Sequence, residues 1–356
     1  MSLSLGIVGL PNVGKSTLFN ALTRSKQANV ANYPFCTIDP NVGVVEVPDN
    51  RLQQLSDISK SKKIIPTAIQ FVDIAGLVKG ASEGEGLGNK FLSHIRETDA
   101  IVQVVRAFTD NDITHVHNRV DAKEDAEVIN LELALADLQT VAKRLESVKK
   151  NAKAAAAKEA EKQIALLERL HAQLGEGKPV RTLEFVDDEI QWVKEMQLLT
   201  AKPMLYVVNI DESPAGAPVI PQMDAPVITV SAKLEAELAE LSPEDAKVFM
   251  QDLGMTETGL EKLIVAGYKL LNLYTYFTSG EPETRAWTIT AGTKAPDAAG
   301  VIHTDFVKGF VKADVCNWQE FVDCKGWPGV REQGKLRLEG KDYVMRDGDT
   351  CYFHIA

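Results

Sequence analysis

Long apolar runs are missing from this chain of 356 residues, and their absence excludes the most direct route into a membrane. No stretch approaches the roughly 20 consecutive apolar residues that a transmembrane helix needs. The first residues, Met-Ser-Leu-Ser-Leu-Gly, also lack the basic segment that opens a secretory signal peptide. We therefore expect a cytoplasmic protein that has no membrane partner.

Cysteine is scarce and poorly placed for disulfide or metal chemistry. The four cysteines are Cys36, Cys316, Cys324 and Cys351, with no C-x-x-C pair and no histidine at zinc spacing. This pattern argues against a disulfide scaffold and against a structural zinc site. Free thiols in a reducing compartment are the simplest interpretation.

The chain also lacks an excess of positive charge, since its formal net charge is −11. Such a balance argues against broad nucleic-acid binding and against DNA as a partner. One segment differs, because residues 142–163 carry seven Lys or Arg against three acids, a local balance of +4. A solvated helix end and a surface for an anionic partner explain this segment equally well.

Glycine and proline are absent between Glu124 and Leu174. Within this stretch apolar residues recur at spacings of four and three, first from Leu131 and Leu135 to Val148 and again from Leu167 onward. This periodicity predicts two antiparallel helices with a narrow apolar seam, joined by a turn near residues 151–157. We expect this coiled-coil insertion to occupy residues 123–199.

A phosphate-binding motif stands near the start of the chain. Gly9 to Thr17 fits G-x-x-x-x-G-K-[ST], after a short apolar strand and before a helix. In this context backbone N–H groups and the helix dipole bind phosphate. Lys15 would reach the β- and γ-phosphates and Ser16 would ligate Mg²⁺. The loop residues predicted to contact the nucleotide are Asn12, Val13, Gly14, Lys15, Ser16 and Thr17.

Two further stretches carry residues suited to a magnesium-bound triphosphate. The apolar strand from Ala68 to Ile74 leads into the D-x-x-G pattern of Asp73 and Gly76. Asp73 would bind Mg²⁺ through a water, and the Gly76 N–H would approach the γ-phosphate. In the polar loop before residue 40, we expect Thr37 to be a switch residue that closes on Mg²⁺ and the γ-phosphate; the alternative is an ordinary loop threonine.

The residues expected to recognise the base depart from those of a guanine site. The order of motifs is that of a P-loop GTPase core, an α/β fold, but Asn209-Ile210-Asp211-Glu212 replaces N-K-x-D. The longer acid and the lost lysine should weaken guanine selectivity, because a site built for particular hydrogen bonds discriminates sharply. We expect Asn209 to bond the edge of adenine and Ile210 to pack on its ring. Ser231 and Ala232, after the last strand, complete the predicted nucleotide site.

The remaining chain divides into a helix and a small β-rich module. Residues 257–276 are predicted to form a helix, and the short apolar segments that follow indicate a separate α+β domain at 278–356. The nucleotide-binding domain is then expected at 1–122 and 200–277.

The usual water-positioning glutamine after D-x-x-G is replaced by Leu77. Leu77 cannot orient a nucleophile, so another group, a cation or a partner must do so. Asn12 is a candidate ligand for a potassium ion in that role.

These peculiarities together resemble the YchF proteins, the Obg-like ATPase subfamily of P-loop NTPases. The resemblance covers nearly the whole chain and is weakest in the helical insertion and in residues 213–225. The segments that carry it are Gly9–Thr17, Asn32–Pro40, Phe71–Asn89, Arg96–Thr98, Asn209–Glu212, Gly267–Phe277 and Ile302–Phe310.

The resemblance implies a GTPase-like domain, a coiled-coil insertion and a C-terminal β-grasp (TGS) domain. It also implies a slow ATPase that prefers ATP to GTP and associates with the ribosome, through the basic coiled-coil tip and the TGS domain. A histidine matching His115 is implicated in hydrolysis, so the expected catalytic residues are Lys15, Gly76 and His115.

The resulting prediction is a magnesium-dependent ATPase that works as a slow switch on the ribosome. One alternative is a nucleotide-gated RNA- or ribosome-binding module in which hydrolysis is incidental. Another is a true GTPase translation factor, which the residues at 209–212 oppose.

Overall fold

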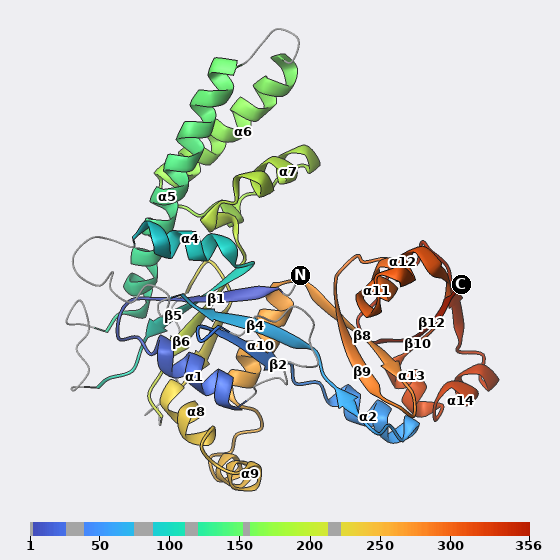
Figure 1. Cartoon of the computed structure of the whole chain (residues 1–356). Helices are drawn as coiled ribbons and strands as arrows, with labels where there is room; N and C mark the ends of the chain where they lie inside the picture. Colours follow the sequence, from blue (N-terminus) through green and yellow to red (C-terminus); the bar gives the residue numbers. More distant parts are fainter. Residues whose placement is uncertain (1–2, 26–38, 75–87, 111–119, 152–156, 213–221) are drawn as a thin grey trace. The chain divides into compact units, whose positions relative to one another are not determined.

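The computed structural model describes residues 3–25, 39–74, 88–110, 120–151, 157–212 and 222–356 (Figure 1). Their contacts divide into two compact units, each described by itself below. The nucleotide unit contains residues 3–25, 39–43 and 70–263, and the C-terminal unit contains residues 44–69 and 264–356. Across these described ranges, no helix is long and apolar enough to cross a membrane.

One sheet has the strand order β2-β4-β1-β5-β6-β7, and its strands β1, β5, β6 and β7 lie wholly in the nucleotide unit. Its strands are β1 (Ser4–Val8), β2 (Val42–Glu46), β4 (Ala68–Asp73), β5 (Ala100–Arg106), β6 (Met204–Asn209) and β7 (Val227–Val230). Every residue of β1, β5 and β6 is buried, which explains why these strands are mostly apolar. The strands β4, β1, β5, β6 and β7 pair in parallel, so their carboxyl ends share one edge of the sheet.

Helices accompany this sheet in the usual alternating order. They are α1 (Lys15–Ser25), α4 (Asn89–Glu97), α8 (Ala232–Leu238), α9 (Pro243–Asp252) and α10 (Gly259–Leu270), whose last turns enter the C-terminal unit. The α1 helix buries Leu18, Phe19 and Leu22 as its apolar stripe. The strand, loop and helix predicted around the phosphate motif are therefore present.

The insertion consists of two long helices and a shorter third one (Figure 1). Its elements are α5 (Ala122–Asn151), α6 (Ala157–Gly175), the 3₁₀ turn η3 (Val180–Thr182), α7 (Asp187–Met196) and the 3₁₀ turn η4 (Leu199–Ala201). Val141 of α5 and Leu167 and Leu170 of α6 lie in one buried cluster with Val193 of α7. The turn predicted between the two long helices falls mostly outside the described residues.

The predicted apolar seam is wrong in the first half of α5. Leu131 and Leu135 are 51% and 46% exposed, whereas Leu133 and Asp137 are fully buried. The reason is that this half of the helix also packs on β5 and η4, which turns Leu133 and Asp137 inward instead of Leu131 and Leu135. The Asp137 carboxylate accepts hydrogen bonds from Leu199 N (2.9 Å) and Thr200 N (2.7 Å), which holds η4 against α5.

The C-terminal unit has its own sheet, with strand order β11-β10-β12-β8-β9-β3. Its strands are β3 (Ile64–Ile65), β8 (Leu273–Ser279), β9 (Thr284–Thr290), β10 (Phe310–Asn317), β11 (Arg337–Glu339) and β12 (Asp349–Ile355). Its helices are α2 (Asn50–Ser59), α11 (Ala295–Ile302), α12 (Asp305–Gly309), α13 (Trp318–Asp323) and α14 (Trp327–Glu332). Two apolar clusters form its core, one around Tyr276 and Phe310 and the other around Phe277 and Phe321.

The contacts place residues 44–69 and 264–277 in the C-terminal unit, whereas the domain boundaries predicted from the sequence put both segments in the nucleotide-binding domain. Residues 44–69 belong to the C-terminal unit, because Leu55 of α2 packs with Phe277 and Phe321 and because β3 pairs with β9 at Ile64 and Thr284. The helix predicted for residues 257–276 is too long. It ends at Leu270, since Asn272 adopts a left-handed φ of 53° before β8 begins.

Candidate nucleotide-binding site

The phosphate loop turns sharply between β1 and α1. Gly9 (φ 151°) and Gly14 (φ 98°) have backbone conformations that side chains rarely adopt, and Asn12 has φ 62°. A Cβ atom at Gly9 would collide with the carbonyl oxygen of Val104, and one at Gly14 would collide with the amide of Asn209. The glycine spacing of the motif is therefore required by close packing as well as by the turn.

Lys15 lies at the first position of α1, with its side chain directed into the loop. The residue is 8% exposed, and its Nζ donates a hydrogen bond to Leu10 O (2.5 Å). Burial lowers the pKa of Lys15 to about 8, while the nearby Asp73 carboxylate opposes that change. A phosphate bound in the loop would favour the charged ammonium again, so this lysine is arranged for an anionic ligand.

Two of the predicted magnesium residues meet at the same edge of the sheet. Asp73 ends β4 and is buried, and Ser16 Oγ lies 3.5 Å from its Oδ2. A hydroxyl and a carboxylate are hard oxygen ligands, and Mg²⁺ commonly uses one or two protein oxygens together with phosphate and water. No cluster of three or more His, Cys, Asp or Glu that could hold a metal occurs among the described residues. The oxygen ligands of Ser16 and Asp73 therefore fit a magnesium ion that binds together with a nucleotide.

Four sequence predictions for the reaction centre lie outside the described residues. They concern Thr37, Gly76, Leu77 and His115.

Asn209, at the end of β6, connects two loops of the site. Its Nδ2 donates to Val13 O (3.0 Å), and its Oδ1 accepts from Ala232 N (2.9 Å). The side chain is buried, so it ties the phosphate loop to the start of α8. Only one N–H of this amide then remains for the adenine edge. Sequence reasoning missed the connection because its three residues are far apart in the chain.

The residues after Asn209 have separate partners. The Asp211 carboxylate accepts from Thr109 N (3.2 Å) and so fixes the chain that leaves β5. Glu212 forms a salt bridge with Lys233 (2.5 Å), which raises the pKa of that lysine. The Ile210 side chain is half-buried. No spacing rule in the sequence pointed to Lys233 as the partner of Glu212.

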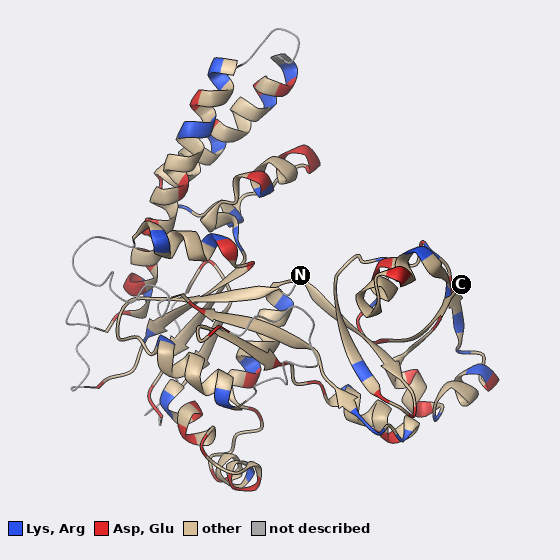
Figure 2. Ribbon diagram, in the orientation of Figure 1, with Lys and Arg blue, Asp and Glu red and all other residues tan. Residues whose placement is uncertain are grey.

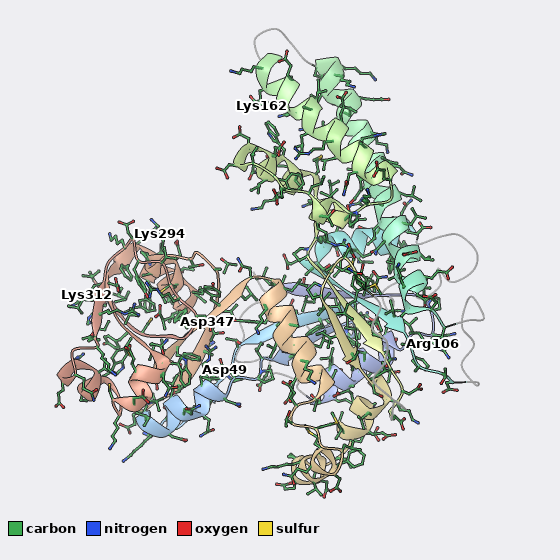
Figure 3. All side chains as sticks on the ribbon, turned by 180° about the vertical axis from the view of Figure 1, so that it is seen from behind. Asp49, Arg106, Lys162, Lys294, Lys312 and Asp347 are labelled. Carbon is green, nitrogen blue, oxygen red and sulfur yellow. The ribbon has the colours of Figure 1, made fainter. Side chains whose placement is uncertain are left out.

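Arg106 supports the same region from the end of β5 (Figure 3). The side chain is almost completely buried, and its guanidinium donates to Phe108 O (3.2 Å) and Asp110 O (3.1 Å). It also lies over the Phe108 ring, 4.2 Å from the centroid. These contacts fix the residues that precede 111–119, the segment that contains His115. Sequence reasoning did not single out Arg106.

The carboxyl edge of this sheet thus combines a phosphate loop, a buried lysine, a hydroxyl–carboxylate pair and an asparagine clamp. Together they define a P-loop nucleotide-binding protein with the GTPase-like order of motifs.

Comparisons with known proteins identify the family. Residues 273–356 match the family model YchF-GTPase_C, described as a protein of unknown function, and residues 4–150 match MMR_HSR1, described as 50S ribosome-binding GTPase. The chain is 52% identical to the "Ribosome-binding ATPase YchF" of Bacillus subtilis (strain 168), over all of both chains. It is 50% identical to the protein of that name from Escherichia coli O157:H7, with 99% of each covered. The chain belongs to the YchF family, as its motifs predicted.

A solved structure supports the fold over nearly the whole chain. The "Structure of the Schizosaccharomyces pombe YchF GTPase" superposes with a TM-score of 0.90 at 41% identity, covering 99% of this chain and 98% of that one. The predicted fold class, a P-loop core with a coiled-coil insertion and a C-terminal β-grasp domain, is confirmed. The printed names of these relatives differ between ATPase and GTPase, so they leave the choice of nucleotide open.

Proposed function

We propose that this protein is a magnesium-dependent ATPase that prefers ATP to GTP, hydrolyses it slowly and acts as a nucleotide switch on cytoplasmic ribosomes. The observation that carries the proposal is the base-reading segment. Ile210 stands in place of the usual lysine, and the carboxylate of Glu212 is paired with Lys233. Glu212 is one methylene longer than the usual aspartate and its carboxylate is held by Lys233, so it is displaced from the position that would accept the two donors of guanine, and adenine does not need it.

The phosphate side of the site supports hydrolysis by in-line attack of water on the γ-phosphate. Lys15 and the N–H groups of residues 12–17 would neutralise the charge that develops on the phosphate oxygens. Ser16 and Thr37 would hold Mg²⁺ directly and Asp73 through a water, and the ion would supply further charge neutralisation. Gly76 would donate its N–H to the γ-phosphate.

A slow rate follows from the residue after D-x-x-G. Leu77 has no group that could orient water, so we assign part of that task to His115 and to a potassium ion near Asn12. His115→Ala is expected to lower the hydrolysis rate while ATP affinity stays nearly unchanged, as measured by single-turnover kinetics and by binding of a nonhydrolysable analogue. Equal rates in potassium and sodium buffers would remove the cation from the proposal.

The proposed ribosome association rests on the relatives, which are named as ribosome-binding ATPases. The basic residues of α5 and α6 and the C-terminal β-grasp domain are the proposed contacts. Figure 2 shows Lys and Arg distributed along both helices, interspersed with acids.

Nucleotide preference is tested by the dissociation constants for nonhydrolysable ATP and GTP analogues in magnesium buffer. Tighter binding of ATP is expected. Tighter binding of GTP would refute the adenine preference and favour a GTPase translation factor.

A nucleotide-gated binding module remains the second candidate, because Lys143 and Arg144 of α5 have no acidic partner among the described residues. Single-turnover rates with and without ribosomes separate the two functions. A ribosome-associated switch is expected to accelerate when ribosomes are added, whereas a module with incidental hydrolysis should keep its basal rate.

A further inference from the structure

A cavity of about 560 Å³ opens in the insertion, between α5, α6 and α7. Buried Leu166 and Leu167 of α6 and half-buried Trp192 of α7 line it with apolar surface. All three residues belong to the buried cluster that joins these helices. The volume lies within the roughly 300–1,000 Å³ of sites that hold small ligands.

Two cations at this cavity lack acidic partners. Of the basic residues in this segment, Lys149 pairs with Glu168 (2.7 Å) and Lys162 pairs with Asp188 (3.2 Å; Figure 3). Lys143 and Arg144, both exposed residues of α5 that line the cavity, form no ion pair or side-chain hydrogen bond with any other described residue. Two of the basic residues that make up the local charge excess therefore lie at the cavity, where they can meet an anion.

The aromatic wall is also without a polar or aromatic partner. Trp192 makes no ring contact and no indole hydrogen bond to a described residue, whereas Trp287 stacks on Tyr276 and donates to Thr278. The α7 helix also contributes Glu195 to the cavity lining, and one oxygen of its carboxylate accepts a hydrogen bond from Gln191 Nε2 (3.3 Å). The cavity thus combines a flat aromatic surface, an acceptor and two cations.

We propose that this cavity binds one unpaired nucleotide of single-stranded RNA. The base stacks on Trp192, Lys143 and Arg144 bind the flanking phosphate, and Glu195 accepts a hydrogen bond from an exocyclic amine of the base. An acidic peptide fits less well, because it would place a carboxylate beside Glu195, where a nucleobase offers an amine instead. This inference rests on the proposed ribosome association and gives it a chemical partner.

The test uses the full-length protein and a short fluorescein-labelled single-stranded RNA of mixed sequence, with binding followed by fluorescence anisotropy. Trp192→Leu is expected to weaken binding roughly ten-fold, and Trp192→Tyr to retain most of the affinity, because stacking needs an aromatic ring. Replacing Lys143 and Arg144 together by alanine should reduce the slope of log affinity against log salt by about 1.4. The matched control is Lys158→Ala, because Lys158 is an exposed residue of α6 outside the cavity. This variant should leave the loss of RNA affinity caused by Trp192→Leu unchanged.

Several outcomes would overturn the inference. They are an absence of RNA binding by the wild type, equal affinity of the wild type and a folded Trp192→Leu variant, and displacement of the RNA by an acidic, aromatic peptide but not by unlabelled RNA. Loss of affinity in both Trp192→Leu and Trp192→Tyr would also reject stacking.

Co-sedimentation of the same proteins with ribosomes distinguishes a failure of the cavity assignment from a failure of the proposed function. If the wild type sediments with ribosomes while the cavity variants bind RNA normally, only the cavity assignment fails. If the wild type does not sediment with ribosomes, the proposed function fails.

Discussion

Lys15 is the residue whose chemistry depends most on what occupies the phosphate loop. Burial holds its pKa near 8, against an ordinary value of 10.5, so without ligand it begins to lose its proton in mildly alkaline solution. Because the pKa is lowered in the folded protein, the unfolded chain binds more protons between about pH 8 and 10.5. The contribution of Lys15 to the free energy of unfolding therefore rises with pH through that interval. Below the interval, the buried charged lysine destabilises the folded protein by a constant amount.

Nucleotide binding is expected to take up protons through Lys15. At pH 8 about half of the lysine is neutral, so binding an anion that raises its pKa should take up about half a proton per site. Calorimetry in buffers of different ionisation enthalpy measures this number. Lys202, another buried lysine with a lowered pKa, bonds to Arg96 O and Thr98 O away from the loop, so Lys202→Arg is the control that keeps the uptake. Binding without uptake in the wild type would contradict this role.

Asn209 contributes to the site by a connection rather than by base recognition alone. Asn209→Ala would leave Val13 O and Ala232 N without partners in a buried region, at roughly 1–3 kcal/mol for each group. We expect a lower free energy of unfolding in urea and weaker binding of ATP and GTP by similar factors. Asn41→Ala, which removes a surface bond to Asp39 (3.3 Å), should change neither property. A selective loss of ATP binding would instead show that Asn209 mainly reads the base.

At the scale of elements, α2 is a helix of the C-terminal unit although it lies early in the chain. Its N-cap Asp49 accepts from Arg51 N (3.0 Å), and Arg51 reaches Asp347 of the last loop (2.7 Å; Figure 3). Leu55 is fully buried in the cluster that also contains Cys316 and Cys324. Residues far apart in sequence thus complete one core.

Leu55→Ala is expected to destabilise the C-terminal unit by about 2–5 kcal/mol, because it leaves a cavity in that core. Burial raises the pKa of Cys316 to about 12, so this thiol should be inert in the wild type and should react faster with a thiol reagent in the variant. Labelling of Cys316 and Cys324, followed by mass spectrometry, measures the change. Gln53→Ala on the exposed face of the same helix is the control. Equal labelling of Cys316 in both variants would show that α2 is not part of this core.

At the scale of the whole molecule, the two units have separate apolar clusters. Nucleotide contacts are proposed only for the nucleotide unit. A ligand at 100 times its dissociation constant stabilises the unit that binds it by about 2.7 kcal/mol.

Hydrogen exchange should report this difference. With saturating Mg²⁺ and a nonhydrolysable ATP analogue, amides of β1 and β6 are expected to exchange up to about 100-fold more slowly, while those of β10 and β12 keep their rates. A Lys15→Ala protein, which should not bind the analogue, is the control. Equal protection of β10 and β12 would show that the units unfold as one.

The local features of this protein could be predicted from its sequence. The phosphate loop depends on glycines and a lysine only a few residues apart, and the buried strands and the helix α4 appear as short uninterrupted patterns. Local backbone geometry and burial decide such features, so neighbouring residues are enough to recognise them. The family followed from the combination of these motifs.

Features made by distant residues became visible only in the folded chain. The clamp of Asn209 on Val13 and Ala232, the pairing of Glu212 with Lys233 and the place of α2 in the C-terminal core each join segments that no spacing relates. The wrong prediction for Leu131 and Leu135, which are exposed, has the same cause. Helical periodicity shows which residues of α5 share a face, but not which neighbouring element that face contacts. Packing between elements depends on the whole chain, and it also decided which of the basic residues of the insertion are neutralised by acids and which remain available to an anion.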